Sequence, residues 1–311
     1  AISTALITTT VVSLLLTLFG AVCTNGLMSA LNTSADIFAD ASLYLRVYVF
    51  GLLFLFIYNV CTGIFNAMGD SRTPLFLLIL SSVGNVILDV VFVAVLHWGV
   101  AGVAWATFIA QGASGVFAFF LLMRRVRTFD TGHHFILFAP EMLRRLTNYA
   151  IPSIAQQSFV SVGNLIIQYY VNLCGPTVIA GFSVANRINM FALTCCMSFA
   201  SGLSSYVAQN IGARKYENLD RVMRNCLLCA VVTGILLGGG AALAGRQLLH
   251  FYSSDEAVIA AGYERLWIIC GTYLLCGIMD TLASSLRGLG YSVLPMVVSL
   301  IGSCLLRLVW I

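Results

Sequence analysis

Residues 74–96 read PLFLLILSSVGNVILDVVFVAVL, an apolar run in which Asp89 is the single ionisable side chain. A membrane-spanning α-helix needs about 20 mostly apolar residues, and this run meets that length. The whole chain shares its character, since 60% of the 311 residues are hydrophobic and only 9% are charged. Soluble domains carry about 25% charged residues. The composition therefore excludes a cytosolic enzyme, a nucleic-acid binder and a disordered linker, and it predicts an all-α, polytopic membrane protein.

Apolar runs of similar length recur along the chain and predict nine transmembrane helices. They cover residues 5–31, 44–68, 74–96, 99–123, 149–174, 178–206, 226–249, 263–286 and 293–311. Lys and Arg occupy only alternate loops, such as those around Arg72, Arg125 and Lys215. Because basic residues collect on the cytoplasmic side, these loops are predicted to be cytoplasmic.

Two segments 221 residues apart resemble each other. Residues 66–74 (NAMGDSRTP) and 287–295 (RGLGYSVLP) share glycine, serine and proline at equal spacing, and each joins two predicted spans. Such a repeat predicts two pseudo-symmetric halves of equal orientation, as in transporters built from parallel repeats. The shift pairs the first span with the seventh and the third with the ninth, and it leaves three spans without partners. We therefore expect a fragment that holds nine of twelve helices.

This pairing also predicts the domain organisation. Residues 1–125 form a partial N-terminal lobe of four helices, and residues 149–311 form a partial C-terminal lobe of five. The basic segment 126–148 is then a cytoplasmic linker between them. The chain begins at Ala1 without a methionine, which fits the expectation of a fragment.

Asp89 is the leading functional candidate, because an ionisable residue inside a membrane is costly and usually functional. Asn85 precedes it by one helical turn, and Thr107 on the next span is predicted at a similar depth. A carboxylate beside amide and hydroxyl oxygens suits Na⁺ or a titrating proton. Alternatively, Asp89 bonds neighbouring helices and has no role in transport.

Further polar residues lie in the second half of the sequence. Asp280 is a candidate second titrating group, or its side chain snorkels toward the cytoplasm. Arg187 is expected to pair with a carboxylate or to meet a substrate. Span 149–174 carries a polar stripe at helical spacing that cannot face lipid, so it lines a cavity or bonds to a neighbouring helix. The candidate cavity-lining residues are Gln157, Ser161, Asn164, Gln168, Arg187 and Met190.

Several motifs, in order, resemble those of multidrug and toxic compound extrusion (MATE) transporters. They are 66–74, 85–89, 99–107, 151–153, 209–213 and 286–290. The resemblance covers essentially the whole chain, as helices three to eleven of the family's twelve. It implies a two-lobed antiporter of the bacterial inner (plasma) membrane that exchanges Na⁺ or H⁺ for amphipathic, often cationic, organic compounds.

The resemblance also implies roles for residues. Asn85, Asp89 and Thr107 match the family's cation site in the N-terminal lobe, with no metal beyond a possible Na⁺ at Asp89 and no cofactor. The implied partners are drug-like small molecules and the lipid bilayer, with no nucleic acid, and the protein is expected to be monomeric. Some members carry a glutamate on helix seven, where the early polar positions here are Gln156 and Gln157, which cannot titrate. The carboxylate that some members carry on helix ten falls at Cys276, one turn before Asp280, which leaves a second cation site without support.

Other functions fit the sequence less well. A flippase for lipid-linked oligosaccharides or a polysaccharide exporter has a related architecture, but it should line its cavity with several cations, and only Arg187 and Arg307 are available. An intramembrane aspartyl protease using Asp89 and Asp280 fits less well, because their predicted depths differ and no GxGD motif is present. A zinc enzyme lacks clustered ligands.

Overall fold

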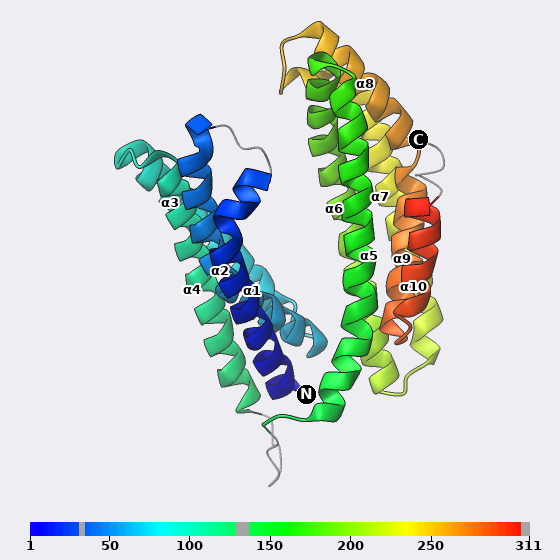
Figure 1. Ribbon diagram of the computed structural model, residues 1–311. Helices are drawn as coiled ribbons and strands as arrows, with labels where there is room; N and C mark the ends of the chain where they lie inside the picture. Colours follow the sequence, from blue (N-terminus) through cyan, green and yellow to red (C-terminus); the bar gives the residue numbers. More distant parts are fainter. Residues whose placement is uncertain (31–34, 129–136, 306–311) are drawn as a thin grey trace. The chain divides into compact units, whose positions relative to one another are not determined.

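The computed structural model describes residues 1–30, 35–128 and 137–305, and every element in them is helical (Figure 1). The elements are α1 (Ile2–Ala30), α2 (Ala35–Ala67), α3 (Arg72–Asp89), the π-helix η1 (Val90–Val95), α4 (Gly99–Val126), α5 (Pro140–Leu173), α6 (Pro176–Gly212), α7 (Glu217–His250), α8 (Glu256–Cys270), α9 (Tyr273–Gly288), α10 (Val293–Ser299) and the π-helix η2 (Leu300–Leu305). The predicted all-α class is confirmed.

Within these residues, seven helices are long and apolar enough to cross a membrane. Helices α8 and α9 form an eighth candidate that is bent by 49°. The ninth predicted span corresponds to the shorter α10 and η2; its last residues, including Arg307, lie outside the described part. The polytopic membrane architecture is therefore confirmed.

The chain divides into two compact units, Ala1–Leu146 and Thr147–Ile311. In the first unit, α2 packs against both α1 and α4, and α3 packs against α4. In the second, α6 contacts α7, α8 and α9, and α7 also packs against α8 and α9. Helix α5 begins at Pro140, inside the predicted linker 126–148, because proline is well tolerated in the first turn of a helix.

Small residues allow the helices to approach closely. A Cβ atom on Gly115 of α4 would lie 2.7 Å from the carbonyl oxygen of Phe54 on α2. In the second unit, a Cβ on Gly238 of α7 would lie equally close, 2.7 Å, to the carbonyl oxygen of Cys270 on α8. Helices in lipid associate through this kind of tight backbone packing.

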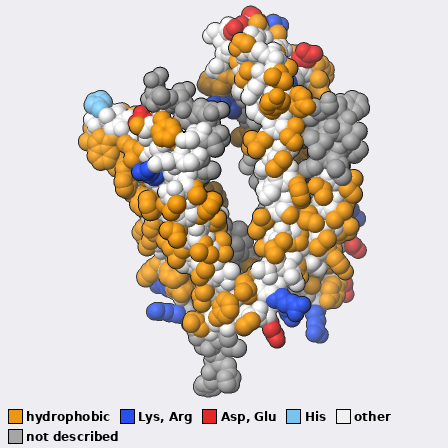
Figure 2. Space-filling view, viewed as in Figure 1, with side chains coloured by type: hydrophobic (Ala, Val, Ile, Leu, Met, Phe, Trp, Pro, Cys, Tyr) orange, Lys and Arg blue, Asp and Glu red, His pale blue; other side chains and the backbone are white. Residues whose placement is uncertain are grey.

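The outward surfaces are apolar, as a bilayer requires. Figure 2 shows hydrophobic side chains over the flanks of the helices in each unit, with charged side chains mostly near helix ends. Phe76 of α3 is 78% exposed and Leu243 of α7 is 90% exposed. Large apolar side chains at such exposure suit a surface solvated by lipid rather than water.

The sequence repeat is a structural repeat as well. A shift of 221 residues maps the first residue of α2 onto the first of α8, and the last residue of α2 onto the last of α9. The same shift maps Arg72, which starts α3, onto Val293, which starts α10. These three element boundaries of the two halves therefore coincide.

The turns at the centre of the repeat have the same hydrogen bonds. Gly69 has φ 82° and Gly290 has φ 97°, a left-handed conformation that glycine adopts without strain. In the first turn, the amides of Gly69 and Asp70 donate to carbonyl oxygens three and five residues back. The amides of Gly290 and Tyr291 do the same in the second turn. Both turns therefore end their helices with a Schellman arrangement.

The two halves differ in the helix that precedes each turn. Helix α2 is continuous, whereas its counterpart breaks at Gly271 and Thr272 into α8 and α9. The predicted span over 263–286 corresponds to this bent pair of helices, and the break itself was not predicted. The Thr272 hydroxyl donates to the carbonyl oxygen of Ile269 at 2.7 Å, which satisfies a backbone group at the break.

Candidate functional site

Asp89 lies where the backbone changes its helical form. It is the last residue of α3, and the π-helix η1 follows it directly. The wider winding is seen in the amide of Leu96, which donates to the carbonyl oxygen of Val91, five residues back, at 2.9 Å. Single π-helical turns are frequent at functional sites. The sequence analysis missed this feature, because nothing in the run of valines that follows Asp89 distinguishes a π-helix from an α-helix.

Two polar atoms on this segment are buried without a partner. Oδ1 of Asp89 and Nδ2 of Asn85 make no hydrogen bond in the described structure. Their residues lie one turn apart on α3, and the side chains of both are half-buried. Buried polar groups in proteins are almost always paired, so the space beside these two unpartnered atoms is the candidate ion site, and that role stays a prediction. An amide can turn either its oxygen or its nitrogen toward that place.

Thr107 lies on the partner helix at nearly the same depth. Helices α3 and α4 are packed together, and a Cβ on Gly102 would lie 3.1 Å from Cβ of Phe92, so these two residues oppose each other. Thr107 lies about 8 Å along α4 from Gly102. Asp89 lies about 5 Å from Phe92 along the neighbouring helix, which runs antiparallel to α4. The depths of Thr107 and Asp89 therefore agree to about 3 Å. No hydrogen bond joins the three side chains among the described residues.

Aromatic rings surround the Thr107 segment of α4. Phe108 makes edge-to-face contacts with Trp105, at 5.5 Å between ring centroids, and with Phe54 of α2, at 5.8 Å. Phe92 of η1 lies 5.0 Å from Trp98. The contact between Phe108 and Phe54 packs this part of α4 against α2.

A different polar arrangement surrounds Arg287 in the second unit. Nη2 of Arg287, on α9, donates to Oε1 of Gln156 on α5 at 3.1 Å. Nε2 of Gln156 in turn donates to Oγ of Ser299 on α10 at 2.7 Å. The chain of hydrogen bonds therefore joins three helices, and Nε of Arg287 is buried without a partner. The sequence does not predict this network.

Asp280 is half-buried on α9, two turns before Arg287 and on the same helical face. Helical side chains lean toward the N-terminus of their helix, so Arg287 leans toward Asp280. Gln156, and not Gln157, enters the hydrogen-bonded network. A titrating role for Asp280 stays a prediction.

The predicted cavity-lining residues lie on α5 and α6. Gln157, Ser161, Asn164, Arg187 and Met190 are exposed within their unit, and Gln168 is half-buried. The hydroxyl of Ser161 donates to the backbone of its own helix, and Gln168 donates to Asn172 on the same helix. Exposed polar groups on a spanning helix need water or another polar surface, since lipid offers no partners. That they line a cavity stays a prediction.

Comparison with known proteins gives this architecture a family. The MatE family model matches residues 1–91 and 152–310, one segment in each compact unit. This chain belongs to the MatE family. The resemblance drawn from the sequence motifs is therefore confirmed.

Two MatE relatives from Bacillus subtilis strain 168 illustrate the similarity. The probable multidrug resistance protein YoeA is 24% identical over 306 residues, which is 96% of this chain and 66% of YoeA. The probable multidrug resistance protein YpnP is 25% identical over 287 residues, which is 90% of this chain and 63% of YpnP. The chain thus spans slightly less than two thirds of the length of either relative.

Solved MatE structures share the fold. A crystal structure of MATE in complex with MaL6 matches with a TM-score of 0.88 at 20% identity, over 96% of this chain and 68% of that one. An outward-facing multidrug resistance MATE family transporter of the MOP superfamily matches with a TM-score of 0.85 at 20% identity, over 94% of this chain and 65% of that one.

Proposed function

We propose that this MatE protein is part of a secondary active exporter that exchanges Na⁺ or H⁺ for amphipathic, often cationic, organic compounds across the plasma membrane of a bacterium. The names of the relatives support multidrug resistance as the activity. The observation that carries the proposal is the buried, unpartnered carboxylate oxygen of Asp89 beside the unpartnered amide of Asn85. Family membership favours a transporter over an intramembrane aspartyl protease.

The proposed coupling follows from the cost of an unsatisfied carboxylate. A buried carboxylate without a partner is unfavourable, and either Na⁺ or a proton relieves that cost. Oxygen atoms of Asp89, Asn85 and Thr107 are the ligands that Na⁺ prefers, whereas a proton needs the Asp89 carboxylate alone. Ion binding then favours the conformation in which this site is closed, and substrate binding favours another. Energy enters transport only through those differential affinities.

The remaining parts of the proposal concern the second unit and the assembly. The exposed stripe of α5, with Arg187 and Met190 of α6, would face the substrate. Asp280 would be a second titrating group. We propose a monomer that needs no cofactor besides the coupling ion. A flippase or polysaccharide exporter is the alternative, and it would require more cations than Arg187 along the substrate path.

Efflux from vesicles tests the proposal. The full-length protein is reconstituted, Na⁺ and pH gradients are imposed separately, and export of a fluorescent cationic dye is followed. Asp89→Asn should abolish efflux driven by the coupling ion. Asp220→Asn removes an exposed carboxylate in the first turn of α7 and should leave efflux intact. Undiminished ion-driven efflux by the Asp89→Asn variant would refute the role of Asp89.

A further inference from the structure

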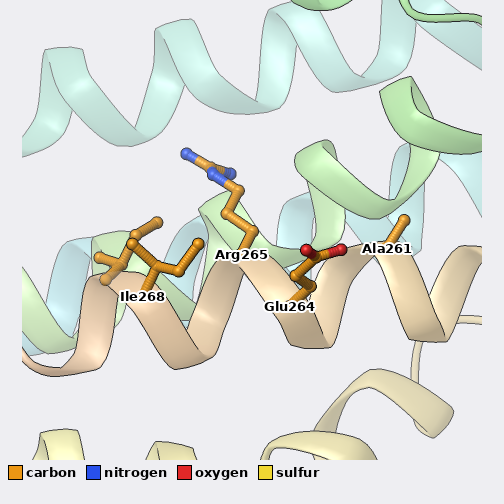
Figure 3. A pocket seen from close by; sticks show the side chains of 5 residues that line it. Ala261, Glu264, Arg265 and Ile268 are labelled. Carbon is orange, nitrogen blue, oxygen red and sulfur yellow. The ribbon is translucent and has the colours of Figure 1, made fainter.

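A groove of about 310 Å³ runs along one face of α8, in the second unit. It is lined by Ala261, Glu264, Arg265, Ile268 and Ile269. Figure 3 shows the Arg265 side chain extending away from the helix, with Glu264 on one side of it and Ile268 on the other. The groove therefore presents one cation, one anion and an apolar floor, and it shares no residue with the site at Asp89.

The guanidinium of Arg265 is held firmly by neutral groups. Nη1 donates to the backbone carbonyl oxygen of Phe182 at 2.6 Å, and the guanidinium carbon lies 3.4 Å from the centroid of the Phe182 ring. Nη2 makes a longer contact, 3.5 Å, with Oδ1 of Asn186. All of these partners belong to α6, and none carries a charge.

No carboxylate neutralises Arg265 in the described part of the chain. The ion pairs found there join Glu256, the first residue of α8, to Arg246 and to His250. A guanidinium has five N–H donors, so its contacts with α6 leave donors for a further acceptor. A planar cation with a fixed orientation is the group proteins use to bind carboxylate or phosphate.

Glu264 places the opposite charge next to this cation. Its side chain is exposed, and it lies about 12 Å along α8 from Glu256, the first residue of the helix. A carboxylate at that depth is too costly to face hydrocarbon, so the groove opens on water or on the headgroup layer. A ligand with only an anionic group would be repelled by Glu264, and one with only a cationic group would be repelled by Arg265.

We propose that this groove binds the charged end of a zwitterionic amphiphile. Its carboxylate or phosphate pairs with Arg265, its ammonium pairs with Glu264, and its apolar chain lies on Ile268 and Ile269. The chemistry is shared by two sources, a phospholipid with a phosphoethanolamine headgroup and a soluble zwitterionic compound. The binding claim does not depend on the coupling ion or on export.

Calorimetric titration of the full-length, delipidated protein in detergent tests the proposal. The probes are short-chain phosphatidylethanolamine, short-chain phosphatidylglycerol as an anion, an alkylammonium as a cation and N-dodecylglycine as a soluble zwitterion. Both zwitterions should bind at least tenfold more tightly than the anion or the cation. Tighter binding of phosphatidylethanolamine than of N-dodecylglycine identifies the ligand as lipid, and the reverse order identifies a soluble compound.

Variants test whether Glu264 and Arg265 bind the ligand or only stabilise the fold. Glu264→Gln changes an exposed side chain, so the protein should fold normally and lose about tenfold in affinity for the zwitterions, while its affinity for the anion rises. Arg265→Lys keeps the positive charge but loses the planar pair of N–H donors. It should lower the affinity for both zwitterions by a similar factor. Glu256→Gln is the matched control on the same helix and should leave binding unchanged. Equal affinities for all four probes, or zwitterion binding that Glu264→Gln does not alter, would overturn the proposal.

Discussion

Arg287 of α9 and Gln156 of α5 are joined by a hydrogen bond of 3.1 Å between residues 131 positions apart in the chain. The amide of Gln156 continues the connection to Ser299 of α10. A single glutamine side chain thus joins three helices, and among the described residues it is the acceptor for the Arg287 guanidinium.

Loss of Gln156 should therefore destabilise the second unit. Gln156→Leu removes both hydrogen bonds and leaves a half-buried guanidinium without its acceptor, at a cost of about 1.5–3 kcal/mol. Thermal unfolding in detergent measures the effect. Gln157→Leu is the control, because Gln157 is exposed, and it should stay within about 0.5 kcal/mol of the parent protein. Equal stabilities for the two variants would contradict the role given to Gln156.

Alanine substitutions at two neighbouring glycines of α7 should change the stability of the protein in opposite directions. Gly238→Ala drives a Cβ to 2.7 Å from the carbonyl oxygen of Cys270, so the helices must separate, at about 1–3 kcal/mol. Gly239→Ala meets no atom within 4 Å and should stabilise the helix by up to about 1 kcal/mol, because alanine has the higher helix propensity. Melting temperatures of the two variants give the comparison, and a stable Gly238→Ala variant would be the contrary result.

Thr107 should contribute to the affinity for the coupling ion but not to the maximal rate of efflux. Thr107→Ala removes one neutral oxygen ligand but leaves the Asp89 carboxylate, so the ion concentration for half-maximal efflux should rise about tenfold. The measurement is efflux from vesicles at graded Na⁺ or H⁺ concentrations. Thr194→Ala removes an exposed hydroxyl of α6 that bonds to its own helix, and it should leave the ion dependence unchanged. If protons are the coupling ion, the effect of Thr107→Ala should be small.

The turn before α3 should stabilise the protein in a pH-dependent way. The Thr73 hydroxyl donates to Asp70 at 2.7 Å and the Thr73 amide donates at 3.1 Å, and these hydrogen bonds lower the pKa of Asp70 below its ordinary value. A carboxyl group whose pKa falls on folding stabilises the folded state above its unfolded pKa of about 3.9. That contribution is lost as the pH falls through the lower, folded pKa.

Thr73→Val should raise the pKa of Asp70 and remove part of this stabilisation. The difference in melting temperature between parent and variant should be present at pH 6 and should vanish at pH values below the folded pKa. Leu294 occupies the equivalent position in the second turn, where Tyr291 replaces the aspartate, so Leu294→Val should show no such pH dependence. If the difference in melting temperature between the parent and Thr73→Val persists unchanged in acid, the effect is due to packing and not to the ionisation of Asp70.

Much of the architecture could be predicted from the sequence, because each helix that crosses a bilayer must be long and mostly apolar. Long apolar runs predicted the helices, and the match between 66–74 and 287–295 predicted a repeat whose turns prove to share glycine geometry and hydrogen bonds. Both signals are local, since composition decides what enters lipid and glycine decides where a left-handed residue fits.

The parts that could not be predicted depend on contacts between distant residues. The π-helix after Asp89 and the break at Gly271 arise in runs whose composition also suits an ordinary helix. The choice of Gln156 over Gln157 as the partner of Arg287 depends on how α5 rotates against α9, and single-sequence patterns do not determine that rotation. For the same reason the sequence does not predict that the guanidinium of Arg265 is held by α6.

The break between α8 and α9 has a mechanical consequence. A continuous helix such as α2 acts as a lever that carries a displacement from one end to the other. We expect its jointed counterpart to flex at Gly271, so that a displacement of α8 is transmitted only in part to α9. We therefore expect the second half to be the more compliant of the two.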